Sequence, residues 1–301
     1  MQTILIATSS FNSKILSEYI PFFKKKKIKV LLNPYKRTLN QSNLKKIFDK
    51  NLIGIISGNE KISSKILKLS PNLKIISRCG IGSDNIDMDF ARKNSIKVTF
   101  TYQEPVYATA ELTLLHILNA IRKFNFNSDK RNLIDWKRKK GNSLEGKKIG
   151  IIGYGNVGKK LSNLLKPFRC KIYFYDKVKT KNKNFLKLNQ LIKNCDIVTL
   201  HLPLTNKTRD IIDLKRLNLL KENSIILNIA RGGLINESDI FKFLKSRKDI
   251  IACFDSYEKE PYKGKLLSLE NTILTPHVGS FTKESRDQME YKAMKNLCKN
   301  L

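Results

Sequence analysis

Short apolar runs rich in Ile and Val alternate along the chain with longer amphipathic segments of helical length. Buried parallel strands have such uniform apolar runs, and the helices of βαβ units supply the segments between them. In the first third of the chain, the predicted strands are residues 4–7, 28–32, 54–57, 74–77 and 97–100. We therefore predict one doubly wound parallel sheet with helices between its strands.

The pattern changes after residue 102. A break at Glu104-Pro105 precedes residues 108–122, a nearly uninterrupted apolar run that is too long for a strand and predicts a helix buried on several sides. A polar, basic stretch follows at residues 125–145. A second series of strands is predicted at residues 148–152, 171–175, 196–200, 224–229, 250–254 and 272–274. These strands predict a second doubly wound sheet, so the fold class is α/β throughout.

The length and the last segment of the chain indicate two domains. A typical domain uses roughly 150 residues, and the chain has 301. Residues 283–301 predict a helix with no strand after it, and we expect this helix to return to the first domain. The predicted domains are residues 1–101 with 283–301, and residues 102–282.

The composition is that of a globular protein, with 41% hydrophobic and 28% charged residues and only 14 Gly and 8 Pro. The charge is unusual, because 58 Lys and Arg outnumber 26 Asp and Glu and give a formal net charge of +32. A polyanion such as nucleic acid is therefore an alternative partner. The lysines are spread over almost every segment, however, and the densest run, residues 24–27, lies at a predicted helix end. We expect a solvated surface and no specific nucleic-acid partner.

Five cysteines, at positions 79, 170, 195, 253 and 298, are odd in number and far apart, without a Cys-x-x-Cys pair. Neither a disulfide framework nor a zinc site is indicated, and we expect no metal. The first residues run directly into a strand-like segment, and no apolar run approaches membrane-spanning length. We expect a protein of the reducing cytoplasm with no membrane partner.

A glycine-rich turn follows the first strand of the second series. Residues 153–158, Gly-Tyr-Gly-Asn-Val-Gly, stand directly after the strand and open a helical segment. This context matches the dinucleotide-binding fingerprint. Gly153 permits the tight turn, Gly155 lets backbone N–H groups approach a pyrophosphate, and Gly158 allows close packing of the helix on the sheet.

Asp176 ends the next predicted strand, about 20 residues after the turn, as the fingerprint requires. Its carboxylate can accept hydrogen bonds from the adenosine ribose hydroxyls and would repel a 2′-phosphate. The cofactor is therefore predicted to be NAD. Lys177 and Lys179 just beyond Asp176 leave NADP as an alternative.

The chain has three histidines. His116 lies inside the apolar helix 108–122 and is interpreted as a core histidine. His201 follows the strand 196–200 at its carboxyl end, where ligands collect in parallel sheets, and we interpret it as a wall of the cofactor cleft and not as a catalyst. His277 ends the last strand in a turn with Pro before it and Gly after it, which can present an imidazole to the cleft.

Two other turns at carboxyl ends of strands carry Arg231 and the acidic residues Asp255 and Glu260. An arginine, a carboxylate and a histidine are therefore expected at one rim of one sheet. The three groups suit reduction of a 2-keto acid, because a guanidinium can hold the substrate carboxylate while an imidazolium delivers a proton as hydride arrives from a nicotinamide. A carboxylate beside the histidine favours the charged imidazolium and orients it.

At these residues the sequence resembles the D-isomer-specific 2-hydroxyacid dehydrogenases, and within that family the phosphoglycerate dehydrogenases. The resemblance covers nearly the whole chain. Its motifs are residues 71–87, Ala110-Glu111-Leu112-Thr113, the glycine turn, residues 201–205, the Asn-x-Ala-Arg-Gly element at Arg231, the Glu-Pro element at Glu260 and Thr275-Pro276-His277. It implies a flavodoxin-like substrate domain and a Rossmann NAD-binding domain that close over the ligands, and a homodimer formed through the cofactor domain.

The resemblance also implies a role for each site residue. Arg231 would anchor the substrate, Glu260 would partner the histidine, and His277 would be the general acid/base, while Asp255 would lie near the nicotinamide carboxamide. The implied cofactor-binding residues are Gly153, Gly155, Asn156, Val157, Gly158, Asp176, His201, Pro203, Thr208, Ala230, Arg231, Asp255, His277 and Gly279. The implied substrate-binding residues are Arg78, Cys79, Gly80, Ile81, Gly82, Arg231 and His277.

The leading substrate is 3-phosphoglycerate, oxidised to 3-phosphooxypyruvate, and the alternatives are glyoxylate, hydroxypyruvate or another 2-keto acid. The turn at residues 57–61 lacks the arginine that some phosphoglycerate dehydrogenases place there for the substrate phosphate. Arg78 or the basic cluster at residues 137–140 could supply that charge. Formate is not expected as a substrate, because the formate dehydrogenases of the superfamily carry glutamine where Glu260 stands.

A non-catalytic NAD-sensing protein is the alternative from another class. Transcriptional corepressors resemble the same family and keep the catalytic residues, and the +32 charge would suit a role near nucleic acid. We expect no partner-binding extension, which argues against this role. It also ends soon after the predicted last helix, so we expect neither the C-terminal regulatory domain of many serine-pathway enzymes nor feedback inhibition by serine.

Overall fold

The computed structural model describes residues 1–178 and 180–301, which form two compact units. The first unit comprises residues 1–105 and 282–301, and the second comprises residues 106–281. The break at Glu104-Pro105 thus ends the first unit, and the long helix α5 (Val106–Ile121) begins the second. The last helix, α12 (Lys283–Lys299), belongs to the first unit.

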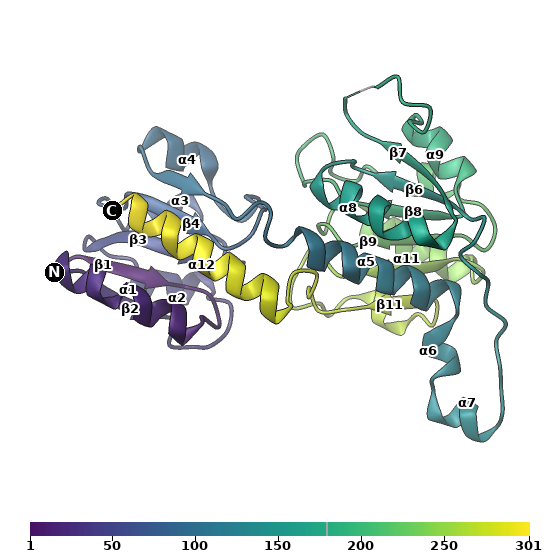
Figure 1. Ribbon diagram of the computed structural model, residues 1–301, viewed down its shortest axis with the longest axis horizontal. Coiled ribbons are helices and arrows are strands. Elements are labelled where there is room, and N and C mark those ends of the chain that lie inside the picture. The colour runs from purple at the N-terminus through teal and green to yellow at the C-terminus, as the bar shows by residue number, and fades with distance from the viewer. Residues whose placement is uncertain (179) are drawn as a thin grey trace. The chain divides into compact units, whose positions relative to one another are not determined.

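The first unit contains one parallel sheet of five strands, in the order β2-β1-β3-β4-β5 (Figure 1). This is the flavodoxin-like order of a doubly wound sheet. The strands are β1 (Thr3–Ile6), β2 (Lys29–Leu32), β3 (Leu52–Ser57), β4 (Ile75–Arg78) and β5 (Lys97–Thr99). The other helices of this unit are α1 (Ser13–Lys25), α2 (Gln41–Ile47), α3 (Ser64–Leu67) and α4 (Met88–Lys93).

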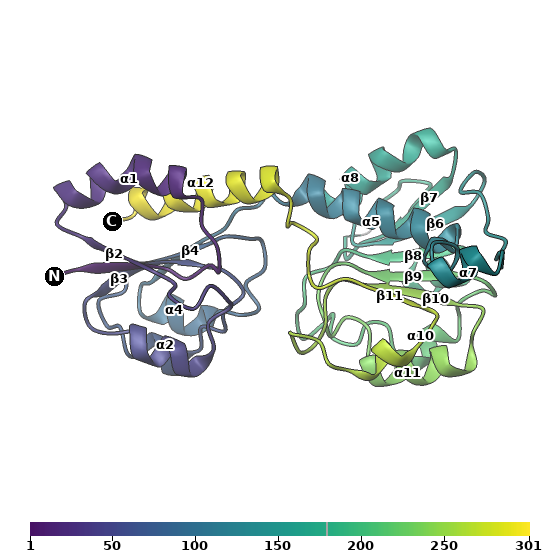
Figure 2. The same cartoon turned by 90° about the horizontal axis from the view of Figure 1, so that it is seen from below.

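Helices cover both faces of this sheet, with α1 and α12 on one face and α2 and α4 on the other (Figure 2). All six residues of the central strand β3 are buried, which is why the sequence shows an unbroken apolar run there. On the face under α12, Met289, Met294 and Leu297 pack in one cluster with β-strand isoleucines. Gly54 of β3 lets α12 approach, because a Cβ there would lie 2.9 Å from Leu297 Cδ1.

The second unit contains a parallel sheet of six strands, in the order β11-β10-β9-β8-β6-β7. The strands are β6 (Lys148–Ile152), β7 (Lys171–Tyr175), β8 (Ile197–Leu200), β9 (Ile225–Asn228), β10 (Ile251–Phe254) and β11 (Thr272–Leu274). The further helices are α6 (Phe124–Asn127), α7 (Lys130–Ile134), α8 (Asn156–Leu165), α9 (Leu188–Asn194), α10 (Leu214–Leu217) and α11 (Glu237–Ser246), with 3₁₀ turns at Lys166–Phe168 and Lys265–Ser268.

The chain leaves β6 toward β7 on one side and places β8 on the other, so the winding of the sheet changes direction between β6 and β8. Ligands of open α/β sheets bind outside the carboxyl ends of the strands at such a switch point. Helices α5 and α8 cover one face of the sheet, and α10 and α11 cover the other (Figure 2). The predicted fold class, two doubly wound parallel α/β sheets, is confirmed.

Candidate active site

The glycine turn lies between β6 and α8, at the switch point of the second sheet. Gly153 has a φ of +98°, and a Cβ there would lie 2.6 Å from the carbonyl oxygen of His201. A Cβ at Gly158 would lie 2.3 Å from the carbonyl oxygen of Gly153. Both positions therefore require glycine, one for the turn and both for close packing.

Gly155 differs from these two glycines, because a Cβ there would meet nothing within 4 Å. It is the N-cap residue of α8, and Asn156 and Val157 begin the helix. The turn thus leaves open space directly before the amino end of a ten-residue helix, whose backbone N–H groups favour an anion. This shape fits the diphosphate of a dinucleotide.

Asp176 follows β7, and its Oδ2 accepts a hydrogen bond of 2.8 Å from the backbone N–H of Tyr154 in the glycine turn. The carboxylate is therefore held at the turn, in the place where it can meet a ribose hydroxyl. Lys177 is exposed beside it. Lys179, the other lysine that left NADP open, lies outside the described residues.

His201 follows β8, and its backbone forms the surface against which Gly153 packs. Its Nε2 lies 3.0 Å from Thr199 Oγ1, and burial lowers its pKa to about 4, so the ring is neutral at pH 7. The loop that follows is closed on itself, because Thr208 Oγ1 donates to the carbonyl of Pro203 at 2.6 Å. These residues border the glycine turn and hold no acid–base pair.

His277 and Glu260 are hydrogen-bonded to each other at the opposite side of the same rim. His277 Nδ1 lies 2.9 Å and 2.8 Å from the two carboxylate oxygens of Glu260, and both side chains are about two-thirds buried, with 28% and 32% of their area exposed. The carboxylate thus holds Nδ1 and leaves Nε2 to exchange a proton with a substrate. His277 adopts a left-handed backbone conformation with φ +53°, which is uncommon outside glycine.

The surroundings of Glu260 favour the ionised form of its carboxylate. Burial raises the pKa of Glu260, but the hydrogen bond and charge of His277, the backbone N–H of Tyr257 and the positive charge of Arg231 outweigh burial and lower the pKa overall. The carboxylate therefore stays ionised and stabilises a positively charged imidazole beside it. Arg231 follows β9, the strand next to β10, and its positive charge is among those that lower the Glu260 pKa.

Arg231 stands in the turn after β9. The Asn228 side chain donates to the Arg231 carbonyl at 2.7 Å, and Arg231 Nη1 donates to the Ala230 carbonyl at 2.8 Å. Gly232 lets this turn pack against the turn after β10, since a Cβ there would lie 2.0 Å from the carbonyl carbon of Tyr257. The close packing of the two turns brings Arg231 toward Glu260.

Asp255 follows β10 and binds the turn that carries His277. Its Oδ1 accepts from Thr275 Oγ1 at 2.7 Å and from the Val278 N–H at 2.8 Å, and its Oδ2 accepts from the Gly279 N–H at 2.8 Å. Burial raises the pKa of Asp255, and these three donors together with His277 oppose that shift. The Asp255 carboxylate therefore holds the turn after β11 in position through these hydrogen bonds.

The structure thus brings Arg231, Glu260 and His277 together at the carboxyl ends of β9, β10 and β11, which are neighbours in the sheet. The same edge of the sheet carries the glycine turn after β6. A guanidinium, an imidazole bound to a carboxylate and a dinucleotide cradle at one edge can bind a carboxylate, move a proton and position a nicotinamide.

The predicted substrate residues 78–82 belong to the first unit, where Arg78 ends β4 and residues 79–82 follow it. Arg78 is only 5% exposed, and its guanidinium donates to the Cys79 carbonyl at 2.6 Å and to Asn59 Oδ1 at 2.9 Å. A Cβ at Gly80, whose φ is +145°, would lie 2.9 Å from Arg78 Nη1. Arg78 is thus engaged in holding the loop, and Ile81 is the exposed side chain of the loop.

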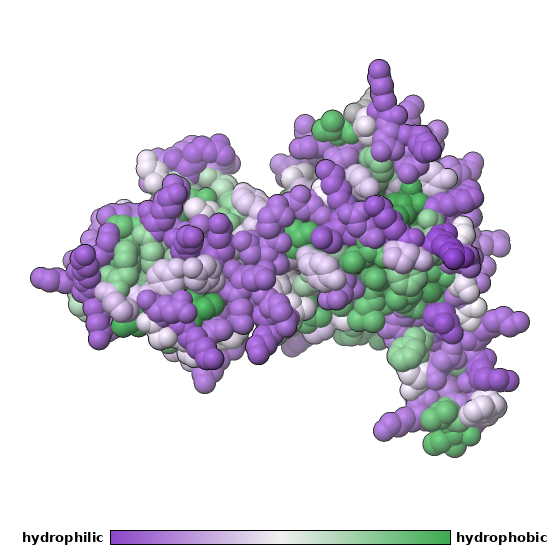
Figure 3. Space-filling view, viewed as in Figure 1, coloured by the Kyte–Doolittle hydropathy of each residue, from purple (hydrophilic) through white to green (hydrophobic). Residues whose placement is uncertain are grey.

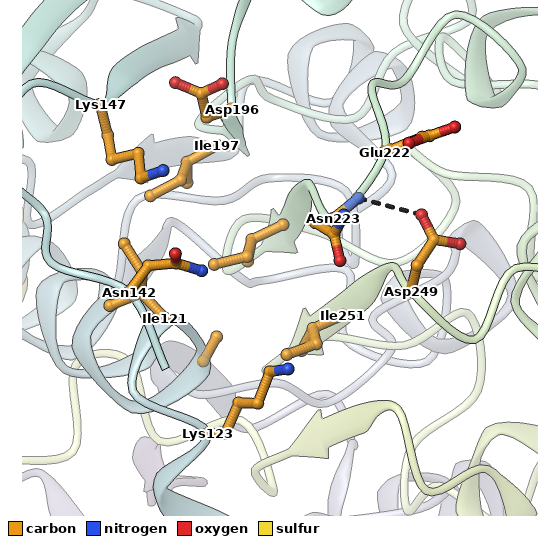
Figure 4. Close-up of a pocket in the computed structure, with 12 residues that line it drawn as sticks. Ile121, Lys123, Asn142, Lys147, Asp196, Ile197, Glu222, Asn223, Asp249 and Ile251 are labelled. Carbon is orange, nitrogen blue, oxygen red and sulfur yellow. Dashed lines mark hydrogen bonds between the residues drawn. The ribbon is translucent and has the colours of Figure 1, made fainter. Parts of the chain in front are cut away.

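A pocket of about 420 Å³ lies at the opposite edge of the second sheet (Figure 4). Lys123, Lys147 and Asp196 line it together with isoleucines at the amino ends of β8, β9 and β10. Asn223 closes one wall, where its N–H donates to Asp249 at 2.9 Å. None of the predicted site residues lines this pocket.

Sequence reasoning missed two contributors. Thr275 and Gly232 stand inside quoted motifs, but only the three-dimensional packing shows that the Thr275 hydroxyl binds Asp255 and that Gly232 permits the contact between turns. His116 lies in the core as predicted, with 2% of its surface exposed. It is hydrogen-bonded through one nitrogen only, within the described part of the chain.

Among residues 1–178 and 180–301, no group of three or more His, Cys, Asp or Glu side chains is arranged to hold a metal ion. In the same residues, no helix combines the length and the apolar character needed to cross a membrane.

Comparison with known proteins gives a consistent picture. The family model of the D-isomer specific 2-hydroxyacid dehydrogenase NAD binding domain matches residues 114–279. A hydroxypyruvate reductase of Thermotoga maritima is 34% identical over 272 residues, which cover 87% of this chain and 89% of that protein. A D-3-phosphoglycerate dehydrogenase of Methanocaldococcus jannaschii is 38% identical over 253 residues, 81% of this chain and 48% of that protein, so the chain spans about half of its length.

Solved structures agree with these sequence relatives. The NAD⁺-bound 3-phosphoglycerate dehydrogenase of Entamoeba histolytica superposes with a TM-score of 0.82 and 26% identity, covering 99% of this chain and 94% of that one. The matched family model is that of an NAD-binding domain, and the glycine turn and Asp176 have the shape that NAD requires. The chain therefore belongs to the D-isomer-specific 2-hydroxyacid dehydrogenase family and is an NAD-dependent oxidoreductase.

Proposed function

We propose that the protein interconverts a D-2-hydroxy acid and its 2-keto acid, with Arg231 as substrate anchor and His277 as general acid/base. The observation that carries this proposal is the hydrogen bond of His277 to the Glu260 carboxylate, on the same sheet edge as Arg231 and the glycine turn. When bound, NAD supplies the hydride acceptor or donor. The residues of this chain bind the acid and handle the proton.

In the oxidation direction, the Arg231 guanidinium binds the substrate carboxylate and thereby fixes the 2-hydroxyl near His277. The imidazole accepts the hydroxyl proton on Nε2 while Nδ1 stays bound to Glu260. Because Glu260 remains ionised, the resulting imidazolium is stabilised. In the reduction direction the same Nε2 returns the proton to the carbonyl oxygen.

The first candidate substrate is 3-phosphoglycerate, and the relative from Methanocaldococcus jannaschii that bears this activity in its name supports it. The second is a small unphosphorylated acid such as hydroxypyruvate or glyoxylate. The engagement of Arg78 with Asn59 and the Cys79 carbonyl favours this second candidate, because a buried guanidinium that is already bound to its own loop and to the turn after β3 is a poor phosphate site.

The test is NADH consumption by the purified protein with 3-phosphooxypyruvate, hydroxypyruvate, glyoxylate and pyruvate. We expect turnover of at least one acid, and the substrate with the highest kcat/KM decides between the two candidates. Arg231→Ala should lower kcat/KM by about two to three orders of magnitude, because the substrate carboxylate loses a partly buried, charged partner. The kcat/KM of Arg231→Lys should lie between that of the wild type and that of Arg231→Ala.

Lys259→Ala, which removes an exposed cation of the neighbouring turn, is the matched control and should leave kcat/KM unchanged. Full activity of Arg231→Ala would contradict the anchor role. Binding of NADH without turnover of any keto acid would overturn the proposed reaction and favour the NAD-sensing alternative. The salt dependence of the protein's retention on DNA would then give the number of phosphate contacts that this alternative role requires.

We also propose a homodimer formed through the second unit, in a reducing compartment. Helices α6 and α7 extend from that unit and carry apolar side chains on their surface (Figures 1 and 3). Leu133, Ile134 and Trp136 are 62%, 82% and 69% exposed, respectively. Solvent-exposed apolar groups of this size favour burial against a second copy. The five free thiols support the proposal that the protein is located in the reducing cytoplasm.

A further inference from the structure

A partly buried chain of hydrogen bonds runs from α5 to the turn that carries His277. His116 Nε2 lies 3.2 Å from Thr275 Oγ1, and Thr275 Oγ1 lies 2.7 Å from Asp255 Oδ1. Asp255 in turn accepts the N–H groups of Val278 and Gly279, the two residues directly after His277. All five residues belong to the second unit.

The direction of each hydrogen bond follows from counting protons. The carboxylate of Asp255 can only accept, so the single hydroxyl proton of Thr275 goes to Asp255 Oδ1. The Thr275 oxygen then has only lone pairs to offer, and His116 Nε2 must be the donor. This assigns the Nε2–H tautomer to His116.

The other ring nitrogen agrees with that assignment. In the described part of the chain, His116 Nδ1 is buried without a hydrogen-bond partner. In the Nε2–H tautomer Nδ1 is a bare acceptor, whereas the reverse direction would bury an N–H donor with no acceptor, which is the rarer defect in folded proteins. Burial lowers the pKa of His116 to about 4, so the ring is neutral at pH 7.

We propose that His116 is a positioning residue of the active site, which through the Thr275 hydroxyl fixes the Asp255 carboxylate and thereby the turn that presents His277. The proposal rests on the proposed function for its kinetic consequence. In this turn His277 has a φ of +53°, in the left-handed region that is uncommon outside glycine. An apolar residue would fill the same space in α5 but could not bind Thr275.

The first experiment needs no substrate. The ¹⁵N shifts of imidazole nitrogens distinguish the two neutral tautomers and the charged ring, and His116→Leu assigns the signal of His116 among the three histidines. We expect the neutral Nε2–H tautomer from pH 5.5 to pH 8. An Nδ1–H tautomer, or a ring that becomes charged near pH 6.5, would overturn the proposal whether or not the enzyme turns over a keto acid.

The second experiment compares His116→Leu, which fills the space, with His116→Gln, which keeps an N–H donor at a similar reach. We expect His116→Leu to lower kcat/KM by about five- to tenfold, as the loss of one buried hydrogen bond implies, and His116→Gln to recover most of it. Ile117→Val truncates the next buried residue of α5 by one methyl group and controls for packing; its kcat/KM should match that of the wild type.

The role through Thr275 is tested by a double-mutant cycle. Thr275→Val should lower kcat/KM by the same factor alone as in combination with His116→Leu. Both changes break the same chain of hydrogen bonds, so the second change has nothing further to remove. Independent, additive losses, or a His116→Leu enzyme with unchanged kcat/KM and unchanged NADH affinity, would overturn the proposal. If the wild type turns over no keto acid, the NADH dissociation constants of the same variants replace kcat/KM, and the failure then concerns the proposed reaction alone.

Discussion

Glu260 and His277 show how two side chains set the chemistry of the site. The two residues lie in different turns and are joined by a hydrogen bond of 2.8 Å. The pKa of Glu260 is lowered although the group is partly buried, since His277, the Tyr257 N–H and Arg231 together outweigh desolvation. A persistent negative charge beside the imidazole is therefore a property of the folded protein.

Replacement of Glu260 by Gln keeps the shape and removes this charge. In keto-acid reduction the imidazolium is the proton donor, so loss of its counter-charge should lower kcat/KM at pH 7 by about tenfold or more. The pH at which reduction is half lost should also move to lower values, because less positive charge persists on the ring as pH rises. A pH–rate profile of the variant measures both effects.

Glu258→Gln is the control, because Glu258 is an exposed carboxylate two positions earlier in the same turn. It should leave both the rate and the pH profile unchanged. If the pH at which reduction is half lost does not change in Glu260→Gln, the carboxylate orients His277 without stabilising its charge.

At the scale of the element, different glycines of the glycine turn contribute to stability and to cofactor binding. Gly158 packs against the turn, where a Cβ would lie 2.3 Å from the Gly153 carbonyl oxygen, whereas a Cβ at Gly155 would meet nothing within 4 Å. Gly155 also has a φ of −79°, which alanine adopts freely. The two glycines therefore have different physical roles.

We expect Gly158→Ala to lower the free energy of unfolding by about 1–3 kcal/mol through overpacking. Gly155→Ala should unfold at the temperature of the wild type and bind NADH at least about tenfold more weakly, because its methyl group enters the space of the diphosphate. Thermal unfolding and NADH fluorescence measure the two quantities. Equal NADH affinity in Gly155→Ala would place the diphosphate elsewhere.

At the scale of the whole molecule, the exposed apolar residues around α7 predict a dimer. Ile134→Asp together with Trp136→Ser should convert the dimer to a monomer in light scattering, since charge and polarity at 82% and 69% exposed positions oppose burial in an interface. Leu267→Asp, a change at another exposed leucine of the same unit, should leave the dimer intact. A monomeric wild type would contradict the proposed assembly.

Much of the fold follows from local sequence pattern. Buried parallel strands are apolar along their whole length, so β3 and β6 stand out in the sequence. The limits of β6 and of the edge strand β7 agree with those predicted. The glycine turn is equally local, because one short segment contains the strand end, the turn and the helix start. The return of α12 to the first unit was predicted from the lack of a strand after it.

The domain limits and the roles of individual site residues remain predictions with structural support. The sequence places the boundaries after residues 101 and 282, and the structure divides the chain after residues 105 and 281. Arg231, Glu260 and His277 could be grouped in advance, because parallel strands that are neighbours in a sheet end at one edge. Their mutual distances depend on how the turns pack.

The sequence by itself determined the two doubly wound sheets, the dinucleotide turn and the family, because these rest on periodicity and on contiguous motifs. Only the tertiary structure decided that Arg78 binds its own loop, that Gly232 admits a neighbouring backbone, and that His116 reaches Asp255 through Thr275. Each of these contacts joins groups whose meeting depends on distance and direction between packed side chains and backbones. A pattern of residue types along the chain contains neither quantity.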